Sequence, residues 1–366
     1  MADSNKKVDA KKSPKAKSSS KIRNAILLIV FILINVAVIV ATAVNEFGNS
    51  KSATELSEIK INWWLLLPAT LCFLIAITFE IGKYVLMIRK LSKPNAFSRR
   101  EAWKLARRTV LLGRYYDNIT PAAVGGQPFQ IYYMHKNSKL PTGLATTIPI
   151  FGMISLQISF IIIALIVFLF GGLMQDNPAL VVTAWIGLLF YAFWPVMVGM
   201  ATFFPKATTH IIKFVVKLFA KVKIIKNREE ALEKAEKEVH EYVRSVKLIL
   251  KTRGVFIKTI LMSTVFNLLV ASIPFFVLTA FGGDMDYWSC LTLTTAVMSA
   301  VYFIPTPGNS GAAEGTFYVV FSALSTGYVF WAMLFWRLFS YYIYIIMGPI
   351  IYFRLHLEKK HGRIKS

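Results

Sequence analysis

The sequence predicts an all-α polytopic membrane protein with about 6–8 transmembrane helices and two broken or re-entrant segments. Three observations lead to this class. Apolar residues make up 55% of the 366 residues. Several apolar runs exceed the roughly 18 residues that indicate a membrane-spanning helix. Basic blocks alternate with these runs, which is typical of the cytoplasmic segments of a membrane protein.

The net charge of +23 is concentrated in four blocks rather than spread along the chain. The blocks are residues 1–23, 89–108, 205–254 and 354–366. Because they flank apolar runs, we expect them to face anionic lipid headgroups at the cytoplasmic surface, and we expect no direct binding of nucleic acid. The count of crossings predicts a multi-pass protein of the cell membrane with both termini in the cytoplasm.

The N-terminal part is expected to hold two spans. Residues 1–22 are rich in Lys and Ser, which predicts a disordered basic cytoplasmic tail. The apolar run 23–44 is too long for the apolar core of a signal peptide, so we expect a retained signal anchor. A second span is expected over residues 61–88. The amphipathic stretch 98–112 that follows groups its basic side chains on one side and is expected to lie on the membrane surface.

The rest of a transmembrane domain that extends over residues 23–353 repeats this alternation. Further spans are expected at residues 143–170, 179–204, 255–281, 287–304 and 328–353. Residues 206–253 predict a charged cytoplasmic helical insertion, and residues 354–366 a basic cytoplasmic tail. The stretch 312–325, about 14 residues long, is short of the roughly 20 residues that a span needs, so whether it crosses or re-enters is left open.

Two segments rich in Pro and Gly interrupt the apolar sequence. They are residues 120–128 (TPAAVGGQP) and 305–315 (PTPGNSGAAEG). In lipid, broken backbone is tolerated only where protein or a water-filled cavity satisfies its polar groups. Neither segment contains Lys or Arg, although basic blocks lie nearby, so we expect both at membrane depth. Paired interruptions in the two halves of a membrane protein indicate a transport site.

Ionisable residues near the second interruption are functional candidates, because charge inside a membrane is costly. Arg337 is expected near the middle of the last span, and Glu314 lies within the interruption. We predict that both bind substrate. The alternative is a structural ion pair between the last span and the interruption.

Further ionisable residues lie near the first interruption. Arg114 and Asp117 come just before it and are also predicted to bind substrate, with the Arg fork suited to a lipid phosphate. Glu80 and Lys83 share one face of the second span. For these two we favour a pair at the cytoplasmic end in which Lys83 extends toward the headgroups.

The helix breakers complete the predicted substrate-binding set. Gly permits positive φ and close backbone approach, and a helix that begins after such a break can hold an anion such as a phosphodiester. The set takes Pro121, Gly125, Gly126 and Gln127 from the first segment, and Pro305, Pro307, Gly308 and Gly311 from the second. The alternative is tight helix packing without a ligand. No enzyme motif is present, so we expect no catalytic residue, no metal and no cofactor.

At these interruptions the chain resembles the lysylphosphatidylglycerol synthase transmembrane family, which includes the membrane domain of multiple peptide resistance factor. The resemblance rests on RYYDNITPAAVGGQPFQ from Arg114 to Gln130 and on PTPGNSGAAEG from Pro305 to Gly315. It implies a flippase-like fold that moves aminoacylated phosphatidylglycerol, or a related anionic or polyprenyl lipid, between leaflets. Many members carry an acidic residue at the position of Gln127 and Arg at that of Gln130, which leaves the lipid open.

Two other functions remain as alternatives. One is a phosphatidylglycerol lysyltransferase that depends on lysyl-tRNA, or its membrane subunit, with Asp117 or Glu80 as the general base. The other is a scaffold that recruits a separate synthase through residues 206–253. The longest soluble stretch is about 50 residues, too short for a tandem acyltransferase fold, so this chain resembles a stand-alone form without the synthase domain. A soluble aminoacyltransferase is therefore an expected partner, and the oligomeric state is left open.

Overall fold

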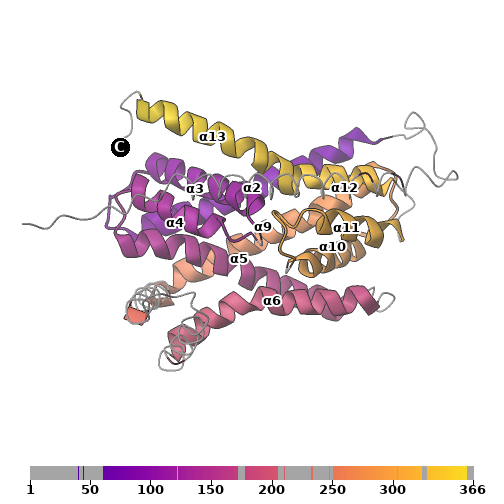
Figure 1. Cartoon of the computed structure of the whole chain (residues 1–366), viewed down its shortest axis with the longest axis horizontal. Helices are drawn as coiled ribbons and strands as arrows, with labels where there is room; N and C mark the ends of the chain where they lie inside the picture. Colours follow the sequence, from indigo (N-terminus) through magenta and orange to yellow (C-terminus); the bar gives the residue numbers. More distant parts are fainter. Residues whose placement is uncertain are drawn as a thin grey trace, which may run out of the picture.

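The computed structural model describes residues 61–121, 123–171, 178–204, 250–302, 304–323 and 328–360, with a few isolated positions elsewhere. Every regular element within these residues is a helix, which confirms the all-α class. The helices run roughly alongside one another, as Figure 1 shows. The predicted tail 1–22, the first span and nearly all of the insertion 206–253 lie outside the described residues.

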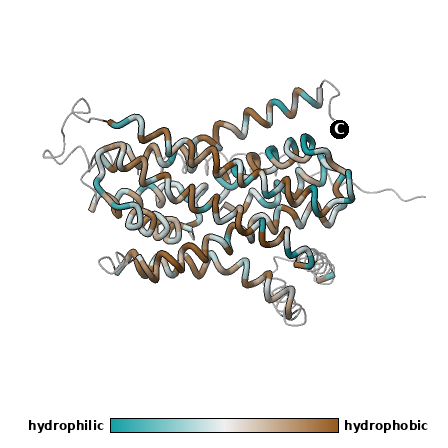
Figure 2. The backbone as a smooth tube through the Cα atoms, turned by 180° about the vertical axis from the view of Figure 1, so that it is seen from behind, coloured by the Kyte–Doolittle hydropathy of each residue, from teal (hydrophilic) through white to brown (hydrophobic). Residues whose placement is uncertain are grey.

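Five helical segments of the described residues are long and apolar enough to cross a membrane. They are α2 (Leu66–Leu91) with the turn before it, α5 (Thr142–Phe170), α6 (Pro178–Phe203), α9 (Arg253–Ala280) and the segment Val329–Leu355. The helix α10 (Tyr287–Val301) is apolar but shorter. Figure 2 shows hydrophobic residues over the helix bodies and hydrophilic ones gathered at the end where the C-terminal helix finishes. The chain is therefore a multi-pass membrane protein.

The centre of the fold is the contact of α2 with α9, reinforced by a buried cation. Lys83 on α2 is fully buried and lies 2.7 Å from the carboxylate of Glu80. Its Nζ donates to the carbonyl of Gly152 on α5 at 3.0 Å and to Oγ of Ser263 on α9 at 3.2 Å. The predicted pairing with Glu80 is present, but the expectation that Lys83 extends to the surface is wrong. Three acceptors inside the bundle hold the ammonium, so it has no need of water.

The first interruption separates α3 (Arg99–Ile119) from α4 (Gly126–Asn137). A capping box of Ser98 and Glu101 starts α3, whose first turns carry the basic residues. The helix packs against α2, α4 and the C-terminal helix, and it buries apolar side chains such as Leu105 and Val110. The apolar side of residues 98–112 thus meets other helices, and their position at the membrane surface stays a prediction. The helix continues to Ile119 with a covered face and leads the first interruption into the bundle.

The second interruption separates α10 from α11 (Ala312–Ser322), which has 11 residues and cannot span a membrane. Phe317 of α11 is buried and stacks on Trp336 with ring centroids 4.7 Å apart. The α10–α11 hairpin thus stays inside the protein, as a re-entrant segment does. In Figure 1 it lies toward the opposite end of the molecule from the α3–α4 hairpin.

The last span has a break in its middle. It consists of α12 (Val329–Arg337), a π-helical turn at Leu338–Tyr342 and α13 (Ile343–Lys360). Such π-helical turns are rare in proteins, and those that occur are often found at functional sites. The helix α13 continues past residue 353 into the segment that the sequence marks as a basic tail.

The far end of α13 is attached to α3 by charge. Glu358 accepts a hydrogen bond from Arg108 and lies 3.2 Å from Nζ of Lys104. The hydrogen bond from Arg108 lowers the pKa of Glu358 below its usual range. A carboxylate whose pKa falls on folding stabilises the protein above its unfolded pKa, and this stability is lost as the pH falls.

We therefore expect Glu358→Gln to lower the free energy of unfolding by about 1 kcal/mol at neutral pH, since the site is partly exposed. The difference from the wild-type protein should persist down to about pH 4, near the ordinary Glu pKa, and should shrink as the pH falls below it. Thermal unfolding of both proteins in detergent, from neutral pH to below pH 4, measures this difference in stability. A difference that does not change with pH would contradict the role of the carboxylate charge.

Candidate ligand-binding cavity

The loops of the two interruptions meet inside the protein. Pro121 and Pro307 form an isolated antiparallel bridge between them. Gly308 takes a positive φ of 58°, and a Cβ there would lie 2.4 Å from the ring of Tyr341. In the first loop the positive φ falls on Ala123 rather than on the predicted Gly125 and Gly126.

Asp117 holds the first loop in place. Its Oδ1 accepts a hydrogen bond from the backbone N–H of Gly126, at the start of α4, at 2.9 Å. A carboxylate at this position is favourable because it faces the positive end of the helix dipole. A Cβ on Gly126 would lie 2.2 Å from that oxygen, so Gly126 is needed for close approach rather than for an unusual φ.

This contact predicts that Gly126→Ala destabilises the protein by about 1–3 kcal/mol, because the new methyl group displaces Asp117 from the start of α4. Gly315→Ala on α11 is the matched control, since a Cβ there meets nothing within 4 Å. Its effect should be neutral or slightly stabilising. Equal thermal unfolding temperatures for the two variants would contradict this assignment.

Arg337 and Glu314 form a closed ion pair that fixes the second loop. Nε of Arg337 donates to Oε1 of Glu314 at 2.7 Å, and its NH2 nitrogen donates to Oγ of Ser310 at 2.7 Å. The other oxygen of Glu314 accepts from the backbone N–H of Gly311 at 2.7 Å. Arg337 is 4% exposed and Glu314 1%. This is the geometry of the structural alternative, because neither side chain lines the cavity described next.

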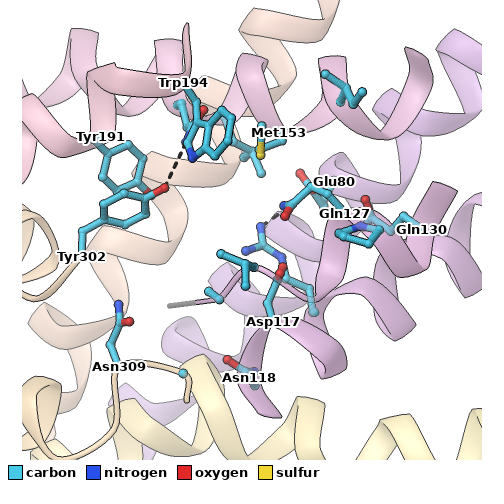
Figure 3. Close-up of a pocket in the computed structure, with 18 of the residues that line it drawn as sticks. Glu80, Asp117, Asn118, Gln127, Gln130, Met153, Tyr191, Trp194, Tyr302 and Asn309 are labelled. Atoms are coloured by element: carbon cyan, nitrogen blue, oxygen red, sulfur yellow. Dashed lines mark hydrogen bonds and ion pairs between the residues drawn. The ribbon is translucent and has the colours of Figure 1, made fainter. Parts of the chain in front are cut away.

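A partly open cavity of about 740 Å³ lies where the two loops meet, and residues of α2 to α6, of the α10 segment and of the last span line it. Four residues of the predicted set line it: Arg114, Asp117, Gln127 and Gly308. The other predicted residues are not among its lining: Pro121, Gly125, Gly126, Pro305, Pro307, Gly311, Glu314 and Arg337. Figure 3 shows Glu80 and Gln127 on one side of the cavity and Tyr191 and Tyr302 on the other.

Several lining residues were missed by reasoning from the sequence. They are Asn309 in the second loop and polar or aromatic side chains of apolar segments: Tyr84, Gln157, Tyr191, Tyr302, Ser340 and Tyr344. Gln157 is the only amide in the run 142–170, and this isolation was a usable signal. The tyrosines gave none, because an aromatic residue in an apolar helix is ordinarily part of the core.

Arg114 is the cation of the cavity, and its charge is incompletely paired. Its NH2 nitrogen lies 3.8 Å from Oε1 of Glu80 and has no hydrogen-bond partner among the described residues. The other oxygen of Glu80 lies closer, at 2.7 Å, to Nζ of Lys83. The Arg114 guanidinium also lies 5.0 Å from the ring centroid of Phe266. Glu80 is thus shared between two cations, which leaves Arg114 able to bind an anion.

Comparison with known protein families agrees with this architecture. Residues 25–348 match the family described as the lysylphosphatidylglycerol synthase TM region. The chain belongs to this family. The predicted resemblance is thereby confirmed, and the protein is a membrane protein of lysylphosphatidylglycerol-related lipid handling. Comparisons with curated proteins and with solved structures gave no match.

The two glutamines of α4 both line the cavity but differ in burial. Gln127 is partly buried. Gln130 is buried, accepts a hydrogen bond from the hydroxyl of Tyr84 at 3.0 Å, and occupies the space that a Cβ on Gly113 would need. Both glutamines are neutral and add no charge to the cavity. Its charged lining residues are Glu80, Asp117 and Arg114.

Proposed function

We propose that this protein binds the polar headgroup of a phospholipid in the cavity and moves it between the two leaflets. The observation that carries the proposal is the incompletely paired guanidinium of Arg114 in a cavity between two broken loops. A lipid phosphate is the anion that an Arg fork binds best in this setting. The cavity volume also lies within the range of typical small-molecule sites.

The charges of the wall favour a headgroup that carries both signs. Asp117 and Glu80 line the cavity together with Arg114. Aminoacylated phosphatidylglycerol presents one phosphate and at least one ammonium group. With its phosphate at Arg114, an ammonium group can lie against the carboxylate of Asp117, whose hydrogen bond from Gly126 leaves its second oxygen available.

The two hairpins support movement of the headgroup rather than binding alone. Each brings a non-helical loop to the same cavity, and so offers a polar route at a depth where lipid offers none. We place both termini and the basic end of α3 and α13 on the cytoplasmic side of the cell membrane, following the positive-inside rule. We expect the soluble aminoacyltransferase that produces the lipid to act on this cytoplasmic side of the membrane.

Leaflet exchange in liposomes tests the proposal. The purified protein is reconstituted with lysyl-phosphatidylglycerol on one leaflet, and the lipid that appears on the other leaflet is measured with an amine-reactive reagent that does not cross the bilayer. We expect exchange well above that of protein-free liposomes. Exchange of lysyl-phosphatidylglycerol at the protein-free rate would overturn the proposal.

A further inference from the structure

One wall of the cavity is apolar and is formed by different helices from those that carry its charges. The charged residues come from α2 and α3. The apolar wall, as we name it, comes from α5, α6 and α10 and consists of Ile150, Met153, Leu156, Trp194, Met197, Val198 and Met298. Figure 3 shows Met153 and Trp194 close to the α6 side of the cavity, away from Asp117. The cavity is therefore amphiphilic, with a polar and an apolar part.

Trp194 lies at an exposed part of the apolar wall. This side chain lines the cavity, and it is 49% exposed. The neighbouring Phe193 and Val196 on α6 are 53% and 55% exposed and do not line the cavity, so they mark the lipid-facing side of this helix. Trp194 is thus next to lipid-facing residues of α6 and also lines the cavity.

The two halves of α6 are held differently. Its first half is fixed to α10 by a close approach, since a Cβ on Gly187 would lie 1.8 Å from the carbonyl oxygen of Ser299. Its second half contains Pro195, which cannot donate a backbone hydrogen bond and weakens the helix there. Pro195 lies directly between two residues of the apolar wall, Trp194 and Met197.

The side chains of the apolar wall suit a flexible occupant. Three of the seven are methionines, whose unbranched thioether chains adapt to ligands of variable shape. The wall is continuous with the part of the cavity that contains Arg114 and reaches an outer surface covered by apolar residues. A molecule whose phosphate lies at Arg114 would place the groups next to that phosphate along this wall.

We infer that the apolar wall is a binding subsite for a hydrocarbon chain of the same lipid, and that the chain leaves the cavity into the bilayer beside Trp194. The inference rests on the proposed function for the position of the headgroup. It adds that the lipid enters and leaves sideways, past the second half of α6, with its chain still in contact with the membrane.

Photo-crosslinking tests the subsite directly. The protein is reconstituted with a phosphatidylglycerol that carries a diazirine on one acyl chain, irradiated, and digested for peptide mapping by mass spectrometry. We expect adducts at Met153, Met197 or Met298 in addition to the outer residue Phe193, which bulk lipid labels in any case. Adducts confined to Phe193 and other outward-facing residues would overturn the inference.

Two variants separate this inference from the proposed function. Trp194→Ala should change the yield of adducts at the methionines, whereas the matched Phe193→Ala should not. Arg114→Ala should reduce these adducts about tenfold if the headgroup anchors the chain. Full labelling of the methionines in Arg114→Ala would leave the chain subsite standing and would count against the phosphate site at Arg114.

Discussion

Arg337→Leu is expected to destabilise the protein by about 3–5 kcal/mol, because it leaves the carboxylate of Glu314 buried without its cation. Glu314 is 1% exposed, and besides Arg337 only the backbone N–H of Gly311 binds its carboxylate among the described contacts. The substitution also removes the donor to Ser310 and the guanidinium that lies 4.6 Å from the ring centroid of Tyr341. The second loop would lose the contacts that hold it against the last span.

Thermal unfolding in detergent measures this loss, and two further variants control for it. In the double variant Arg337→Leu with Glu314→Gln, the buried charge is gone while the side chain still accepts from Gly311, so part of the stability should return. Arg107→Leu, at an exposed position of α3, should change stability by no more than about 0.5 kcal/mol. An Arg337→Leu protein as stable as the wild type would show that the pair does not hold the loop.

Arg114→Ala is expected to reduce leaflet exchange of the phospholipid by about tenfold or more, since a hydrogen bond to a charged group contributes roughly 1.5–3 kcal/mol. The residue is partly exposed in the cavity, and its NH2 nitrogen has no hydrogen-bond partner among the described residues. Folding should therefore change far less than exchange. Arg114→Lys should restore part of the rate, because it keeps the charge but not the fork.

The matched control for this variant is Arg107→Ala, which removes an exposed guanidinium two turns earlier on the same helix. Both proteins lose one positive charge, so a general effect of charge on reconstitution would appear in both. Exchange that falls equally in the two variants would speak for such a general effect and against a phosphate site at Arg114.

The spans could be predicted because apolar length and basic flanks are local properties of the sequence. The described helices begin and end within a few residues of most predicted bounds, and α11 has the short length that marked residues 312–325 as an unusual segment. For the amphipathic stretch 98–112, the sequence could not show what covers its apolar side. A helix with one basic face has the same sequence pattern whether its apolar side contacts lipid or contacts other helices, as it does in α3.

The site could be predicted only in part, because a residue's role depends on which neighbours the fold supplies. Arg114 and Arg337 look alike in sequence, as single cations near a broken segment. The fold gives Arg337 a carboxylate at 2.7 Å and leaves Arg114 with a shared one at 3.8 Å. Tyr191 and Tyr302 are far apart in the chain, and only the packing of α6 on α10 brings their rings to 3.8 Å.

Native mass spectrometry of the protein released from mild detergent tests the phosphate site at Arg114 most directly. Lipids that remain bound to the wild-type protein are identified by mass and compared with those bound to Arg114→Ala and to Arg107→Ala. We predict that the wild-type protein and Arg107→Ala retain a phospholipid, and that Arg114→Ala loses it. Equal retention of the same phospholipid by all three proteins would contradict the assignment of Arg114 as the site that binds the headgroup.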